Sequence, residues 1–140
     1  MWKYYALLSA IFASLTAICV KIGIKNVDSN LATAIRTCII LFITWGIVFA
    51  GDGIAGIKVL TKNNWIFLIF SGVATGLSWL FYFKAMQLGE VSKVAPIDKL
   101  SVAFTIILSF VILKEPVNWR VCLGGMFIVA GSLVMLLGKQ

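Results

Sequence analysis

The sequence predicts an all-α, polytopic integral membrane protein of about five transmembrane helices. Apolar residues form successive runs of about 20 residues, the length that a helix needs to cross the hydrocarbon core of a bilayer. Hydrophobic residues make up 61% of the 140 positions and charged residues only 12%, with a mean hydropathy of +1.06. Short turns separate the runs and leave no room for a water-soluble domain, because a small soluble core could not bury so much apolar surface.

The first two expected helices cover residues 4–24 and 31–50. Trp2 stands at the start of the first, where the membrane interface favours aromatic side chains. Ser29 or Asn30 is expected to cap the second helix, because a short polar side chain accepts hydrogen bonds from the free amides of a first helical turn.

The remaining expected helices cover residues 65–87, 91–113 and 119–137. The loop before them contains the sequence IAGIKVL, which is too short to cross and is expected at the membrane interface. Pro116 separates the last two helices, since proline cannot continue a helix. Residues 1–140 are therefore expected to form one transmembrane domain.

Charge and composition argue against several classes of function. Twelve basic and five acidic residues give a net charge of +7, but the basic residues are scattered and form no stripe for nucleic acid. We expect them to meet lipid headgroups at helix ends. The chain has three cysteines without metal spacing and no histidine, so we expect no metal, no cofactor and no disulfide framework. We expect no enzymatic activity.

Two ionisable residues lie several positions inside their expected helices. Arg36 and Asp98 are each about 7–10 Å from the helix start, at about 1.5 Å per residue, and on the same side of the membrane. Charged groups at this depth are costly and are functional candidates. An Arg36–Asp98 ion pair would be structural, part of a substrate site or a proton-sensitive switch, and the sequence leaves these open. Lys99 adds a positive charge beside Asp98.

Uncharged polar residues extend the candidate pathway. Ser101, Thr105 and Ser109 follow Asp98 on one face of the fourth expected helix. Their hydroxyls either bond back to carbonyls of their own helix or line a polar path. Trp79 lies midway along the third expected helix, as core filler or as a wall that stacks on substrate.

The stretch "YFKAMQLGEVSKVAPIDKLSVAFTIILSFVILKEPVNWRVCLGGMFIVAGSLVMLLG" resembles the second part of an EamA domain. That domain is the repeat unit of the drug/metabolite transporter superfamily. The matching features are the Tyr82–Ala85 run, a proline near the start of the fourth helix, the acidic turn at Glu115 and a glycine-rich last helix. Most members of the superfamily carry two inverted repeats. The resemblance therefore implies an EamA-like half-transporter of the cell (inner) membrane that works as a dimer.

Small residues mark expected helix contacts. Gly72 and Gly76 form a GxxxG motif, which permits close approach of helices. The last helix is similar to that of the small multidrug resistance proteins, and this resemblance implies packing or dimer contacts at Gly125, Ile128 and Gly131. Those relatives also carry a glutamate in the first helix, where this chain has none. If protons are coupled, Asp98 is the expected carrier.

Lysine and arginine are almost evenly divided between the two sides of the membrane. Such a balance permits insertion in both orientations, which an antiparallel homodimer requires. One side holds Lys3, Lys58, Lys62, Lys114 and Arg120; the other holds Lys21, Lys25, Lys84, Lys93 and Lys139.

The sequence therefore predicts a secondary transporter of a small metabolite. We expect it to work by alternating access as a homodimer in the lipid bilayer. Two alternatives stay open: a subunit of a lipid-linked-sugar flippase with a different partner chain, and a membrane scaffold without cargo.

Overall fold

The computed structural model describes residues 1–116 and 118–137, and for Asp52 the backbone alone. Every regular element in these ranges is a helix, and they contain no strand. Five helical segments of this part of the chain are long and apolar enough to cross a membrane. The predicted fold class, an all-α polytopic membrane protein, is confirmed. Lys139, which enters the charge balance above, lies outside the described residues.

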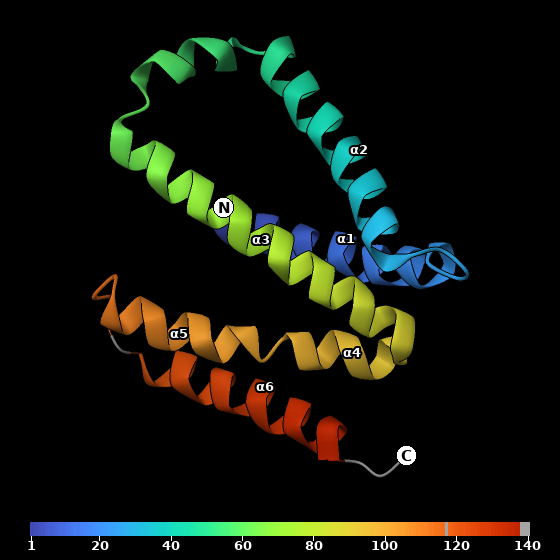
Figure 1. Ribbon diagram of the computed structural model, residues 1–140. Helices are drawn as coiled ribbons and strands as arrows, with labels where there is room; N and C mark the ends of the chain where they lie inside the picture. Colours follow the sequence, from blue (N-terminus) through green and yellow to red (C-terminus); the bar gives the residue numbers. More distant parts are fainter. Residues whose placement is uncertain (117, 138–140) are drawn as a thin grey trace. The chain divides into compact units, whose positions relative to one another are not determined.

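The helices follow one another with short connections (Figure 1). The loop containing IAGIKVL forms the 3-10 helix η1, and the span expected at 91–113 is divided between two helices, α4 and α5. Helices α1, α2 and α3 begin two or three residues before their expected starts, and α6 begins at its expected start. The bounds are α1 Trp2–Gly23, α2 Ser29–Ala50, η1 Asp52–Val59, α3 Lys62–Leu88, α4 Val91–Asp98, α5 Ser101–Val111 and α6 Trp119–Leu137.

Helix α2 is capped by Asp28. One oxygen of its side chain accepts hydrogen bonds from the amides of Asn30 at 2.9 Å and Leu31 at 3.0 Å. The expected cap, Ser29 or Asn30, is therefore wrong by one or two residues. A carboxylate is the better cap here, because its charge also interacts favourably with the positive end of the helix dipole.

The chain forms two compact units, one of Met1–Ile18 with Leu88–Gln140 and one of Cys19–Gln87. In the first unit α6 runs alongside both α4 and α5 (Figure 1). In the second unit η1 lies against the end of α2. The two groups of polar residues described below each belong to one unit.

Large apolar side chains are exposed along the helices. Phe42, Phe81 and Phe127, for example, are 77%, 74% and 76% exposed. Rings this exposed are unfavourable in water but suit lipid tails, which are as apolar as the side chains themselves. Among the described residues, no buried side-chain nitrogen or oxygen lacks a hydrogen-bond partner. This is the condition for a polar group at membrane depth.

The expected small-residue contacts differ from one another. A Cβ atom on Gly125 would lie 2.7 Å from Cδ1 of Ile106, so α6 approaches α5 closely at this glycine. A Cβ atom on Gly72, Gly76 or Gly131 would meet no atom within 4 Å. Gly125 therefore lies in a close contact between α5 and α6, whereas the other three glycines have no such contact.

Candidate substrate and coupling sites

The span from Val91 to Val111 is interrupted at Lys99 and Leu100. The amide of Lys99 donates to the carbonyl of Pro96 at 3.0 Å, and the amide of Leu100 to the carbonyl of Ile97 at 2.9 Å. Both bonds join residues three apart, as in a 3-10 turn, instead of the four of an α-helix. The interruption lies about 12 Å along a span of about 30 Å, well inside the apolar thickness of a bilayer.

Ser132 of α6 forms a hydrogen bond with the backbone at this interruption. Its hydroxyl donates to the carbonyl of Pro96 at 2.9 Å, and it also lies 2.8 Å from the carbonyl of Ile128 in its own helix. In an unbroken helix the Pro96 carbonyl would accept from the amide of Leu100. A side chain inserted into the hydrogen-bond ladder is a recognised cause of a sharp break. Ser132 is 36 positions from Pro96 in the sequence.

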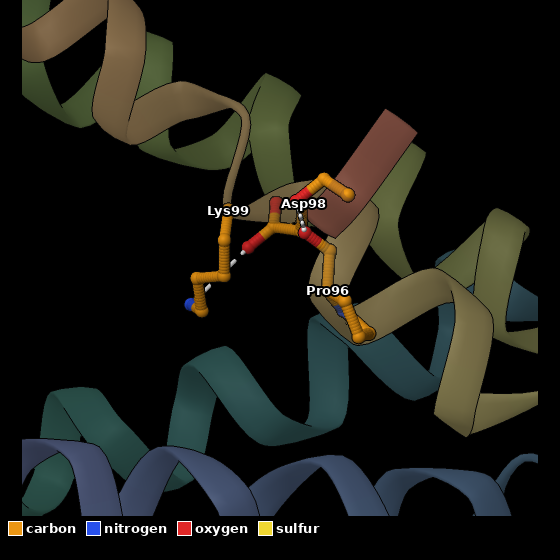
Figure 2. A network of polar contacts seen from close by, with 4 residues as sticks. Pro96, Asp98 and Lys99 are labelled. Carbon is orange, nitrogen blue, oxygen red and sulfur yellow. Dashed lines mark hydrogen bonds and ion pairs between the residues drawn. The ribbon is translucent and has the colours of Figure 1, made fainter. Parts of the chain in front are cut away.

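Asp98 ends α4 directly before the interruption (Figure 2). Its carboxylate lies 3.5 Å from the ammonium of Lys99, and the two side chains are 38% and 57% exposed. The close-up shows the Lys99 side chain reaching back toward the carboxylate (Figure 2). A long, half-exposed pair of this kind is weak, at about 0–1 kcal/mol. The carboxylate of Asp98 can therefore leave Lys99 for another partner at little cost in free energy.

Two of the three hydroxyls on α5 bond back to their own helix. Thr105 donates to the carbonyl of Ser101 at 2.9 Å, and Ser109 to the carbonyl of Ile106 at 2.9 Å. These two bonds are of the kind that hydroxyls commonly form within apolar helices. Each hydroxyl oxygen keeps acceptor capacity, so a role of Ser101, Thr105 and Ser109 in a polar path stays a proposal.

Arg36 of α2 stacks on two aromatic rings of α3. Its guanidinium carbon lies 4.3 Å from the ring centroid of Trp79 and 5.4 Å from that of Phe83. An arginine at membrane depth costs about 2.5–3.5 kcal/mol on insertion scales. A cation–π contact returns about 0.5–2 kcal/mol, so the rings offset part of this cost. The sequence indicates Arg36 and Trp79 separately and gives no indication of Phe83.

A set of hydrogen bonds ties the end of α3 to the start of the same unit. The ammonium of Lys21 donates to the carbonyl of Met86 at 2.7 Å, and the side-chain amide of Gln87 to the carbonyl of Val27 at 2.9 Å. A lysine at the carbonyl end of a helix also interacts favourably with the helix dipole. Lys21 was expected to reach lipid headgroups, and here it bonds to protein instead.

Arg36 and Asp98 belong to different units of the chain. Their pairing stays a prediction. Within the second unit Arg36 contacts aromatic rings, and within the first unit Asp98 contacts Lys99.

Residues 1–137 match the EamA-like transporter family. The chain belongs to this family. It is also 43% identical over 134 residues to a protein of Sinorhizobium sp. named "Uncharacterized transporter in cobO 3'region", with 96% of this chain and 95% of that protein covered. No solved structure matches the chain. The protein is therefore an integral, multi-pass membrane transporter, and the resemblance to EamA domains is confirmed.

Neither of two surface hollows in this EamA-like transporter includes the polar residues above. One hollow of about 300 Å³ lies between the end of α2 and η1, lined by residues such as Thr44 and Trp45. The other, of about 420 Å³, lies at the start of α6 beside Trp119 and Arg120. Among the described residues no group of histidine, cysteine, aspartate or glutamate has the arrangement of a metal site. The candidate sites are thus the interrupted span and the stacked arginine.

Proposed function

We propose that this EamA-like transporter moves a small metabolite by alternating access, with the interrupted fourth span as part of its path. The observation that carries the proposal is the change from α4 to α5 at membrane depth, next to the carboxylate of Asp98. Irregular backbone within a bilayer is tolerated only where protein or a water-filled cavity covers it. Secondary transporters use such discontinuous helices to hold substrates and ions near the midplane.

Each unit carries residues that we propose for transport. In the unit of Met1–Ile18 with Leu88–Gln140, Asp98 provides a carboxylate with Lys99 as its counter-ion, and the hydroxyl face of Ser101, Thr105 and Ser109 follows on the same span. In the unit Cys19–Gln87, Arg36 provides a positive charge beside Trp79.

Transport itself can be tested with purified protein in liposomes. Vesicles are loaded with a mixture of small amino acids, organic acids, sugars and amines, and the contents that leave are measured by mass spectrometry. We expect at least one solute to leave faster than from protein-free vesicles. A scaffold without cargo would release none, and a flippase subunit that needs another chain would release none until that chain is added.

We further propose that the working form is an antiparallel homodimer. Two features support it: the near-even division of lysine and arginine across the membrane, and the open helix surface at Gly72, Gly76 and Gly131. Small residues allow helices of a second copy to approach closely. Ile128, which is 41% exposed, lies one turn from Gly131 on α6.

Antiparallel pairing predicts two orientations in the membrane. Asn30 and Gly56 are uncharged and exposed, and α2 crosses the membrane between them. In a background without the native cysteines, Asn30→Cys and Gly56→Cys should each be labelled to about half by an impermeant maleimide added to intact cells, because a balanced charge leaves orientation unbiased.

Both substitutions leave the count of lysine and arginine unchanged, so they do not bias the result. Permeabilised cells provide the control, in which each cysteine should be labelled fully. Complete labelling of one cysteine and none of the other would mean a fixed orientation. The antiparallel homodimer would then be excluded.

A further inference from the structure

We infer that Arg36, Trp79 and Phe83 form a binding site for the oxyanion of the transported solute, a carboxylate or a phosphate. The inference rests on the proposed transport function and names the chemical class of its substrate. It depends on the contacts within the unit Cys19–Gln87, where all three side chains lie.

The stacking orients Arg36 without using its hydrogen-bond donors. Trp79 and Phe83 are four residues apart on α3, so their rings project from the same face of the helix. They meet the guanidinium at 4.3 Å and 5.4 Å from their centroids. A cation–π contact engages the face of the planar group, while its five N–H bonds lie in the plane. Stacking thus orients Arg36 through the face of its guanidinium, and the in-plane donors point away from the rings.

The unit Cys19–Gln87 supplies no carboxylate to Arg36 among the side chains described. Asp28 accepts the amides of Asn30 and Leu31 as the cap of α2. No ion pair to Arg36 is present among the described side chains of this unit. Since stacking offsets only part of the cost of a charge at membrane depth, an anion is the partner that completes the site.

The shape of the group favours an oxyanion over other ligands. Guanidinium donors form a planar fork that matches two oxygens of a carboxylate or phosphate. The indole and phenyl rings beside it provide apolar surface for the rest of the solute. The bonds from Lys21 to Met86 and from Gln87 to Val27 hold the neighbouring end of α3 in place.

The test is a titration of the protein in discs of neutral phosphatidylcholine. The probes are hexanoate, inorganic phosphate and hexylammonium, the last with the same apolar body as hexanoate and the opposite charge. Trp79 serves as the fluorescent reporter after Trp2, Trp45, Trp65 and Trp119 are replaced by phenylalanine. We expect saturable quenching by an oxyanion, weakened about tenfold by Arg36→Lys because lysine cannot bind two oxygens in one plane, and none by hexylammonium.

Arg120→Lys is the matched control. Arg120 also lies over a tryptophan, with its guanidinium carbon 5.8 Å from the ring of Trp119, but at the exposed start of α6. This change should leave oxyanion binding unaltered. Thermal melting of the protein with all five tryptophans should rank the three probes in the same order, which makes the result independent of the single-tryptophan variant.

The relative strength of hexanoate and phosphate identifies the oxyanion. The inference is overturned if neither oxyanion binds, if hexylammonium binds equally, or if Arg36→Lys binds as the unaltered protein does. It is also overturned if discs containing phosphatidylglycerol quench Trp79 and soluble oxyanions do not compete, since the ligand is then a lipid headgroup. Oxyanion binding without release of any solute from liposomes would instead contradict the proposed transport and leave the site intact.

Discussion

Asp98→Asn should reduce transport driven by a proton gradient by about 100-fold or more while the protein folds normally. Asparagine has almost the same shape as aspartate but cannot release or take up a proton. An intramembrane carboxylate is the usual carrier of protons in transporters, and Asp98 is the acidic residue that the structure describes within a candidate span. Its pair with Lys99 is half-exposed and 3.5 Å long, so its loss should change the free energy of unfolding by no more than about 1 kcal/mol.

The measurement compares solute uptake into liposomes with and without an imposed pH gradient. Glu90→Gln is the matched control, because Glu90 pairs with Lys93 at 3.0 Å in the same stretch of chain but lies just before α4, with its side chain 68% exposed. That variant should transport normally. If Asp98→Asn folds and keeps its response to the pH gradient, proton coupling through Asp98 is wrong.

Hydropathy and length were enough to predict the five spans. A bilayer imposes the same thickness on each crossing, and apolar side chains need no specific partner in lipid. Hydropathy and length do not predict the interruption of the fourth span. Residues 91–113 read as one apolar run because hydropathy reports side chains and not the path of backbone hydrogen bonds. The interruption lies beside Pro96, whose carbonyl accepts the hydroxyl of Ser132, 36 positions away in sequence.

The contact between Arg36 and Trp79 could not be predicted from the sequence either. Each residue was a candidate by itself, Arg36 as a charge within a span and Trp79 as a ring far from the membrane interface. Their contact depends on how α2 and α3 are rotated about their axes, which nearly uniform apolar faces do not specify. Phe83 carries no signal of its own, since phenylalanine is common in these helices. The spacing of four residues from Trp79 is the clue that was available.

The glycines of α6 show that a small-residue motif does not specify which helix packs against it. Gly125 and Gly131 were predicted together as packing or dimer positions. The structure separates them, because Gly125 meets Ile106 of α5 and Gly131 meets open space. A glycine permits close approach but does not select the helix that approaches. That choice depends on which face of α6 the chain turns toward α5.

Ser132→Ala should restore a continuous fourth helix and strongly reduce transport. Without the hydroxyl, the carbonyl of Pro96 can exchange the amide of Lys99, which it accepts at 3.0 Å, for that of Leu100, the bond of an ordinary α-helix. Ser132 is 3% exposed, and alanine fits the same volume. The lost hydrogen bond is worth about 0.5–1.5 kcal/mol, and the new backbone bond replaces it, so stability should change little. Transport should fall by about tenfold or more, because the discontinuity that the proposed path requires is lost.

Hydrogen exchange distinguishes this mechanism from simple misfolding. In Ser132→Ala the amides of residues 97–103 should exchange more slowly than in the unaltered protein, since an α-helical ladder protects them better than 3-10 bonds do. Ser132→Thr keeps the hydroxyl and should keep both fast exchange and transport. If Ser132→Ala shows unchanged exchange and full transport, Ser132 does not create the interruption and the broken span is not needed for function. Slower exchange with full transport would separate the two claims, confirming the role of the hydroxyl in shaping the helix and excluding the break from the transport path.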